Sequence, residues 1–297
     1  MRVLISGASG PIGAVLLRAL KARGCTVTRL VRDGVSGSDQ ISWNPAQPLS
    51  PDSVSGFDVV IHLAGESIVG RWTGAKKRRI LDSRRQGAAH LAEAVAKAAH
   101  RPRVFISASA VGYYGDRGEE ILREESASGS GFLAEVCRQW EAAVQPVAAA
   151  GIRAVQMRLG VVMSAEGGAL QKMLLPFRLG LGGRLGDGRQ WWSWVSADDV
   201  AGAIQHVMDH QELQGPVNTV SPNPVTNVEF TKALAAVLKR RAIFPMPEFA
   251  VRLVFGEMGE ELFLASERVA PAKLTASGYQ FKHPELREAL EAILKAK

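Results

Sequence analysis

The sequence begins with MRVLISGASGPIG (residues 1–13), an apolar run that leads into three glycines spaced three residues apart. Residues 2–6 have the continuous apolar character of a buried parallel strand. The glycines suit, in turn, a tight turn, a close approach of backbone amides to a pyrophosphate, and close packing of a helix on the strand. A helix from Pro11 would direct its positive end at the phosphates. The stretch therefore predicts a nucleotide site made by Gly7, Ser9, Gly10, Pro11, Ile12 and Gly13.

Strand and helix patterns alternate through the first half of the chain. Apolar runs predict strands at 26–31, 58–63, 103–107 and 153–162, and helical patterns fall at about 75–99 and 132–149. Such alternation is typical of a parallel sheet with helices on both faces. The fold class expected is α/β, a Rossmann-type doubly wound parallel sheet with a smaller C-terminal α/β lobe.

The pattern loosens after about residue 163. A glycine-rich stretch leads to Trp191, Trp192 and Trp194, and prolines with short helical segments follow. We expect residues 1–163 to form the Rossmann-type cofactor domain, with some later segments returning to it. Residues 164–297 are expected to form the substrate-side lobe over the carboxyl edge of the sheet, where ligands of such sheets bind. At least one of the three indoles should border the cleft, and the others should pack as core.

Composition restricts the class of protein. The 297 residues are 46% hydrophobic, carry a formal charge of +7, and include two cysteines. We expect no disulfide framework, no membrane-spanning stretch, no signal peptide and no metal site, since the His and Cys residues show no paired spacing. Most basic residues are dispersed, but several cluster at 76–85, on an apparent helix where a solvated face or a contact with a cofactor phosphate explains them better than nucleic acid. The expectation is a cytoplasmic protein with a small-molecule substrate, no nucleic-acid or membrane partner and no metal; a homodimer is left open.

The choice of cofactor is indicated at the end of the second strand. Arg32 lies nineteen residues after Gly13, where an arginine pairs with the 2′-phosphate of NADP and a carboxylate would bind the ribose of NAD. Arg32 therefore favours NADP. Asp33 keeps NAD as an alternative, because a shift of one residue would bring its carboxylate to the ribose. The structural alternative to a cofactor contact is that Arg29 and Arg32 are two surface arginines in a turn.

Several further motifs resemble one superfamily. They are HLAGE (62–66), SASAVGYYG (107–115) and VSADDVA (195–201), in addition to the glycine motif. Together they resemble the extended short-chain dehydrogenases/reductases. The pairs RW (71–72), SR (83–84) and WE (140–141), with LPFRLG (175–180) and GYQF (278–281), resemble its atypical branch of epimerase-family proteins. That branch is described by terms such as sugar-nucleotide epimerase and cell-division-inhibitor-like, and the similarity covers nearly the whole chain.

The resemblance implies further cofactor contacts and shows one departure. It implies Leu63 and Ala64 beneath the adenosine side of the cofactor, Gly65 as a further cofactor-binding residue, and Arg84 reaching the cofactor. Ordinary members carry Tyr-x-x-x-Lys on a helix, where the ammonium lowers the pKa of the phenol. The residues four positions after the three tyrosines of this chain are Arg117, Gly118 and His283, so the dyad is absent. Aligning Trp140-Glu141 puts Leu133 and Cys137 at the two positions, with Cys137 as a buried small hydrophobe.

Four residues are candidates for the missing proton transfer. Ser109 matches the catalytic serine of the superfamily, Tyr113 and Tyr114 offer phenols with Arg117 as a charge partner, and Glu66 follows a strand end at the cleft. The structural alternatives are a strand-end cap for Ser109, packed aromatic side chains for the two tyrosines, and a cap of the next segment for Glu66. His62 is expected in the core. We expect an NADP-dependent oxidoreductase or epimerase-like enzyme acting on a carbonyl or sugar-nucleotide-like substrate; the alternative is a non-catalytic NADP(H)-responsive binding or regulatory protein.

Overall fold

The computed structural model describes residues 1–32 and 34–295, so Asp33, the alternative cofactor determinant, lies outside the described residues. The elements follow in the order β1 (Arg2–Ser6), α1 (Pro11–Ala22), β2 (Thr26–Val31), β3 (Gln40–Ser42), η1 (Pro51–Val54), β4 (Val59–His62), α2 (Gly74–Lys97), β5 (Val104–Ala110), η2 (Val111–Tyr113), β6 (Ile121–Leu122), α3 (Phe132–Ala142), α4 (Gln145–Ala149), β7 (Arg153–Leu159), β8 (Val161–Met163), α5 (Ala169–Arg178), β9 (Trp191–Trp192), β10 (Trp194–Ser196), α6 (Ala197–Asp209), β11 (Gly215–Thr219), β12 (Val225–Thr226), α7 (Asn227–Leu238), α8 (Glu248–Phe255), α9 (Glu257–Gly259), the π-helix η3 (Glu260–Leu264), β13 (Arg268–Val269), α10 (Ala272–Ala276) and α11 (Leu286–Lys295).

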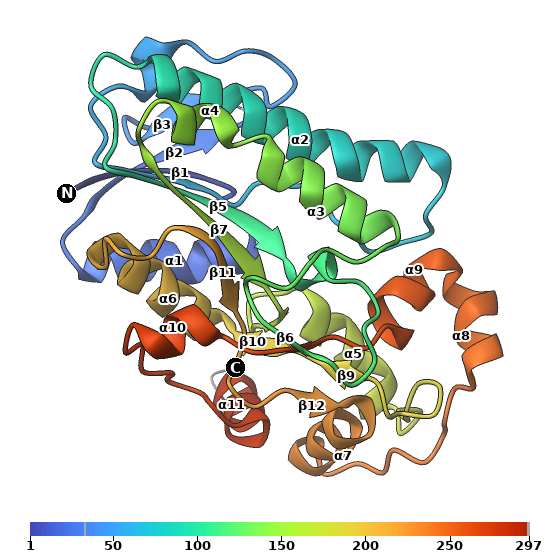
Figure 1. The fold of residues 1–297 in the computed structure, drawn as a ribbon. Helices are drawn as coiled ribbons and strands as arrows, with labels where there is room; N and C mark the ends of the chain where they lie inside the picture. The colour runs from blue at the N-terminus through green and yellow to red at the C-terminus, as the bar shows by residue number, and fades with distance from the viewer. Residues whose placement is uncertain (33, 296–297) are drawn as a thin grey trace.

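The central layer is a seven-stranded sheet in the order β11-β7-β5-β4-β1-β2-β3, with every neighbouring pair parallel. Helices α1 and α6 cover one face, and α2, α3 and α4 cover the other (Figure 1). The order reverses between β1 and β4, and the glycine loop leaves β1 at this switch point, where ligands of such sheets bind. The expected doubly wound α/β fold is confirmed.

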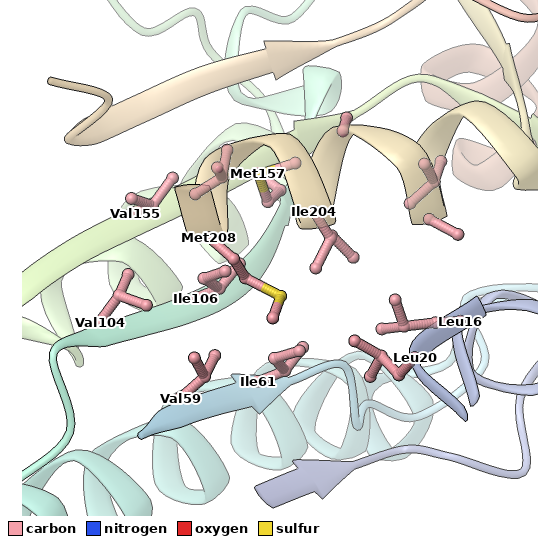
Figure 2. Close-up of a cluster of buried hydrophobic side chains, with 14 of the residues drawn as sticks. Leu16, Leu20, Val59, Ile61, Val104, Ile106, Val155, Met157, Ile204 and Met208 are labelled. Atoms are coloured by element: carbon pink, nitrogen blue, oxygen red, sulfur yellow. The ribbon is translucent and has the colours of Figure 1, made fainter. Parts of the chain in front are cut away.

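Aliphatic side chains fill the space between the sheet and α1 and α6. Figure 2 shows this cluster, whose labelled members are Leu16, Leu20, Val59, Ile61, Val104, Ile106, Val155, Met157, Ile204 and Met208. All ten are at most 1% exposed. The burial of both faces explains why the strands are apolar throughout instead of alternating.

Two elements end earlier than the sequence pattern predicted. The expected strand 153–162 leaves the sheet after Leu159, and β8 pairs with β10 instead. At Gly160 an added Cβ would lie 2.5 Å from the carbonyl oxygen of Ser193, so the crossing of these two segments requires glycine. The expected helix 132–149 divides into α3 and α4, because Pro146 begins a new helix.

The C-terminal half contributes to both parts of the molecule. β11 is the edge strand of the central sheet and α6 packs on α1, so these two segments return to the first part. A separate core joins α5, α7 and α11 with Trp192 and Trp194, which are 6% and 0% exposed. The division at residue 163 stays a prediction.

Two of the sequence motifs meet at the start of α6. The Ser196 hydroxyl caps the helix by accepting from the Asp199 amide at 2.9 Å. The buried Asp199 carboxylate accepts from the amides of Lys282 and His283, at 2.6 and 3.0 Å. The VSADDVA motif therefore fixes the chain just after the GYQF motif.

His62 lies in the core, as expected from its place in a strand. Its Nδ1 is 2.7 Å from the Ser6 hydroxyl, its Nε2 has no partner among the described residues, and burial lowers its pKa to about 4. The folded state therefore resists protonation of this imidazole. The contribution of the neutral His62 side chain to the free energy of unfolding is fully present above the pKa of the unfolded state, near 6.5. This contribution is lost as the pH falls through the pKa of the folded state, about 4.

We expect His62 to make unfolding strongly pH-dependent between pH 6.5 and 4. The shift corresponds to about 3 kcal/mol in the free energy of unfolding. His62→Gln should remove this part of the slope in urea unfolding measured across the range, whereas substitution of the exposed His100 should not. Equal slopes for the wild type and His62→Gln would contradict the assignment.

Candidate functional site

The glycine loop joins β1, α1 and the end of β4 by backbone contacts. Gly7 has φ +74°, and a Cβ there would lie 2.6 Å from the carbonyl carbon of Leu63. At Gly13 a Cβ would lie 2.4 Å from the Gly7 oxygen, and the Gly10 amide donates to that same oxygen at 3.1 Å. Leu63 and Ala64 thus pass directly beside the loop. Glycine is required at positions 7 and 13 because neither has room for a side chain.

The amino end of α1 is left open. Gly10 is the N-cap residue, so no side chain satisfies the first-turn amides, and no acidic residue stands in that turn. Pro11 occupies the first turn, and Ser9 is exposed in the loop. The free amides and the helix dipole together make an anion site.

Arg84 supports the segment behind the loop. It lies against Gly65, and its Nη1 donates to the carbonyl oxygens of Glu66 and Ile80, at 2.9 and 3.2 Å. The guanidinium carbon is 5.0 Å from the centre of the Trp140 ring. Burial lowers the Arg84 pKa. In this structure Arg84 shapes the backbone that follows Leu63 and Ala64 beside the glycine loop.

Basic side chains surround Glu66, three residues after Leu63. Lys76 donates to its carboxylate at 2.7 Å, Arg79 lies 3.9 Å away, and the charge of Arg32 also acts on it. The hydrogen bond from Lys76 is the main reason that the Glu66 pKa is lowered. Arg32 is exposed and forms no hydrogen bond or ion pair with any described residue. A free guanidinium is therefore available near Glu66, and Glu66 is held as a paired carboxylate.

Ser109 and Glu141 belong to a buried polar network. The Ser109 hydroxyl donates to Glu141 at 2.8 Å, and the same carboxylate receives two hydrogen bonds from Arg158, at 2.8 and 2.9 Å. The Arg158 side chain is only 3% exposed. Ser109 is thus engaged at the end of β5, and the pair Arg158–Glu141 joins β7 to α3.

The two neighbouring tyrosines differ in environment. Tyr114 is fully buried, its hydroxyl lies 2.7 Å from Asn218 Oδ1 and accepts from Arg158, and burial raises its pKa to about 12. Tyr113 is half-buried beneath the Arg158 guanidinium, 3.5 Å from its ring centre, and borders a groove of about 840 Å³. Arg117, the charge partner expected from sequence, pairs with Glu120 instead.

The positions aligned with the missing dyad are apolar. The amides of Phe132 and Leu133 donate to the Glu261 carboxylate, both at 2.7 Å, so an acid from the C-terminal part caps α3. Cys137 is buried, and burial raises the pKa of its thiol to about 12. Neither position supplies an acid or base at neutral pH.

Glu267, which the sequence reasoning missed, is close enough to Cys137 for its charge to act on the thiol. Its backbone amide donates to the carbonyl oxygen of Trp191. Its carboxyl group has no hydrogen bond or ion pair within residues 1–32 and 34–295. Burial raises its pKa to about 8, helped by the charges of Asp116 and Glu261. An isolated glutamate after a cluster of tryptophans gives no recognisable sequence signal.

A cavity of about 430 Å³ lies beside Glu267, lined in part by the preceding Ser266. Trp191, half-buried, donates from its indole to Glu119 on the cavity wall at 2.7 Å. Among the described residues, none of the His, Cys, Asp and Glu clusters is suited to a metal ion, and no helix is long and apolar enough to span a membrane.

The comparisons with known proteins agree with this geometry. Residues 3–220 match the NAD dependent epimerase/dehydratase family, and residues 246–293 match a domain of unknown function. An epimerase family protein of Mycobacterium tuberculosis is 42% identical over 290 residues, covering 97% of this chain and 96% of the relative. The human epimerase family protein SDR39U1 is 36% identical over 298 residues, covering 99% and 100%.

The solved structure of human SDR39U1 with NADPH superposes with a TM-score of 0.91 at 35% identity, and all of both chains is covered. A UDP-glucose 4-epimerase from Thermus thermophilus with NAD shares the fold, with a TM-score of 0.79 at 19% identity. The chain therefore belongs to the NAD dependent epimerase/dehydratase family. It is an atypical extended short-chain dehydrogenase/reductase, and this expectation from the sequence is confirmed.

We expect Glu141→Gln to destabilise the protein by about 3–5 kcal/mol, because it leaves the buried Arg158 charge unpaired. Glu291→Gln, which breaks the exposed pair with Arg287, serves as the control and should cost less than about 1 kcal/mol. Urea unfolding of both variants provides the measurement. Similar small losses would mean that the buried pair is dispensable.

Proposed function

We propose that this protein binds NADPH and acts as an NADP-dependent oxidoreductase or epimerase-like enzyme on a small carbonyl or sugar-nucleotide-like substrate. The observation that carries the proposal is the combination of an uncapped, glycine-bounded helix start with the free guanidinium of Arg32, whose charge acts on the nearby Glu66. The NADPH in the structure of human SDR39U1 supports the choice of cofactor.

The fit of such a cofactor rests on the loop itself. Gly7 and Gly13 leave no space for a side chain, and Gly10 leaves the amides accessible. These amides would hold the pyrophosphate, Leu63 and Ala64 would line the adenosine side, and Arg32 would pair with the 2′-phosphate. When bound, the nicotinamide supplies hydride transfer.

Ser109 and Tyr113 remain the stronger of the four sequence candidates for proton transfer. Tyr114 is engaged in the core, and Glu66 pairs with Lys76 among basic residues. Ser109 would have to exchange its bond to Glu141 for one to a substrate, whereas the Tyr113 hydroxyl forms no hydrogen bond with any described residue. Removal of a true acid lowers the rate by about 10²–10⁴-fold. Ser109→Ala and Tyr113→Phe, assayed by NADPH oxidation with a panel of carbonyl compounds and nucleotide sugars, test these roles.

A second function, NADP(H)-responsive binding without catalysis, is favoured by the same network. All four sequence candidates contact protein partners, and the dyad positions hold Leu133 and Cys137. Tight NADPH binding, no turnover with the whole panel and a cofactor-dependent change in protease sensitivity would favour this function over the enzyme.

We expect Arg32→Ala to narrow the preference for NADPH over NADH by about 1.5–3 kcal/mol, the worth of a charge-assisted hydrogen bond. Calorimetric titration with both cofactors measures the change. Arg287→Ala, which removes an exposed arginine of α11, is the matched control and should leave the preference intact. Equal affinities of the wild type for NADPH and NADH would refute the assignment of Arg32.

Gly10→Ala and Gly13→Ala should separate binding from folding. A Cβ at Gly10 meets only the Gly7 oxygen at 3.4 Å, an ordinary contact, but it would project toward the pyrophosphate. We expect this variant to melt near the wild-type temperature and to lose at least about tenfold in NADPH affinity, or ~1.4 kcal/mol. Gly13→Ala should instead lower the melting temperature, because its Cβ overlaps backbone. Unchanged NADPH affinity in Gly10→Ala would argue against the loop as the cofactor site.

A further inference from the structure

Helix α5 carries apolar side chains on two opposite faces. One face is buried in the core that α5 shares with α7 and α11, through Leu170, Leu174 and Phe177. The helical period places Leu175 and Leu179 on the other face, and each of these leucines is 64% exposed. The first face already accounts for the folding of α5, so the second apolar face indicates a contact with something outside the described chain.

A second segment, residues 239–246, lies alongside the end of α5. The Arg240 Nε donates to the Arg178 carbonyl oxygen at 3.2 Å, and the Phe244 amide donates to the Gly182 carbonyl oxygen at 3.3 Å. These bonds join two stretches that lie about sixty residues apart in the sequence. The outer side chains of both stretches are therefore held next to one another.

The joined segments expose further large apolar side chains. Leu181 follows α5, and Ile243 and Phe244 belong to the second segment; with the two α5 leucines, all five are between 56% and 64% exposed. Ala242, by contrast, packs inward on the core of α5, α7 and α11. The second segment therefore covers that core with a small residue and directs its large ones to the solvent.

The charge around these side chains is of one sign. Residues 169–184 and 239–246 contain no Asp or Glu, and their cations are Lys172, Arg178, Arg184, Lys239, Arg240 and Arg241. All six are exposed, and none forms an ion pair with any residue that the structure describes. We refer to these six cations and the five exposed apolar side chains as the basic apolar surface. Its positive charge is not compensated within residues 1–32 and 34–295.

This combination restricts the partner. A two-fold contact with a second copy of the chain would bring the same cations together, so it is opposed by repulsion. A nucleic acid would match the charge, but single strands are bound by stacking on aromatic side chains, and four of the five apolar side chains here are aliphatic. An anionic bilayer surface matches both properties, because its headgroups attract cations and its acyl boundary accepts aliphatic side chains.

We propose that the basic apolar surface docks this protein on a bilayer that contains anionic lipids, with the five apolar side chains at the acyl boundary and the six cations among the headgroups. Such docking needs no spanning helix, and none is present among the described residues. It departs from the expectation of no membrane partner, which considered only spanning stretches. The inference does not depend on the proposed function.

Vesicle co-sedimentation of the full chain tests the charge. The vesicles are made of phosphatidylcholine alone or of equal parts phosphatidylcholine and phosphatidylglycerol. At low salt we expect at least about tenfold tighter binding to the anionic vesicles, since each Lys or Arg near such a surface contributes about fivefold. Lys172→Glu with Arg241→Glu should lower this affinity at least about tenfold. The same charge change at the exposed Lys21 and Lys97 is the control and should alter it less than about threefold.

A second pair of variants tests the apolar part. Leu175→Gln with Leu179→Gln keeps the charge and should remove the binding to anionic vesicles that survives in high salt, because salt screens the charges and leaves apolar burial in place. Ile121→Gln, at an exposed residue of β6, is the control and should retain it. Thermal melting verifies that each variant is folded, and calorimetry should give NADPH affinities within about twofold for all of them.

Several results would overturn the inference. They are no binding of the wild type to anionic vesicles, equal binding to both kinds of vesicle, or variants of the surface that bind as their controls do. Tighter binding to duplex DNA than to vesicles, lost in the Lys172 and Arg241 variant, would make the surface a nucleic-acid site. Sedimentation velocity that shows a dimer, reduced to a monomer by the two leucine substitutions, would make it a contact between copies. Failure to bind NADPH would refute the proposed function and leave the vesicle result standing.

Discussion

The buried ion pair between Arg158 and Glu141 is the constraint around which the centre of the molecule is arranged. A guanidinium only 3% exposed would cost several kcal/mol if it lacked partners. The structure meets this demand with the Glu141 carboxylate, the Tyr114 hydroxyl, the Glu124 carbonyl oxygen and the Tyr113 ring. These partners come from α3, the segment after β5 and the loop after β6. One buried charge thus brings Glu141, which is the partner of Ser109, and both tyrosines into one network.

The surroundings of the glycine loop and of the 430 Å³ cavity carry opposite charge. Arg32, Lys76 and Arg79 surround the single carboxylate of Glu66, shortly after the chain passes the glycine loop. Carboxylates outnumber cations around the 430 Å³ cavity. The net charge of +7 hides this difference, since it sums over the whole chain.

The parts of the fold that the sequence predicted depend on local rules. The glycine loop follows from backbone space at Gly7 and Gly13, and the helices follow from apolar periodicity. The break at Gly160 was missed because its cause, the Ser193 oxygen, lies far along the chain. For the same reason Arg117 was wrongly expected to be the charge partner of the tyrosines, because it lies near them in sequence. Arg117 pairs with Glu120, and Arg158 from β7 lies over the Tyr113 ring instead. Glu267 was missed because its environment is made by Asp116, Cys137 and Glu261, which only tertiary structure brings together.

The glycine loop is at once the joint between β1, α1 and β4 and the place where free amides are presented. A ligand that binds there can bind only the folded chain, because the unfolded chain has no such arrangement of amides. Its binding adds to the free energy of unfolding, by about 2.7 kcal/mol when its concentration is a hundred times its Kd. The cellular concentration of that ligand would then determine how long each copy of the protein survives proteolysis. The abundance of the protein would therefore depend on the cellular redox state.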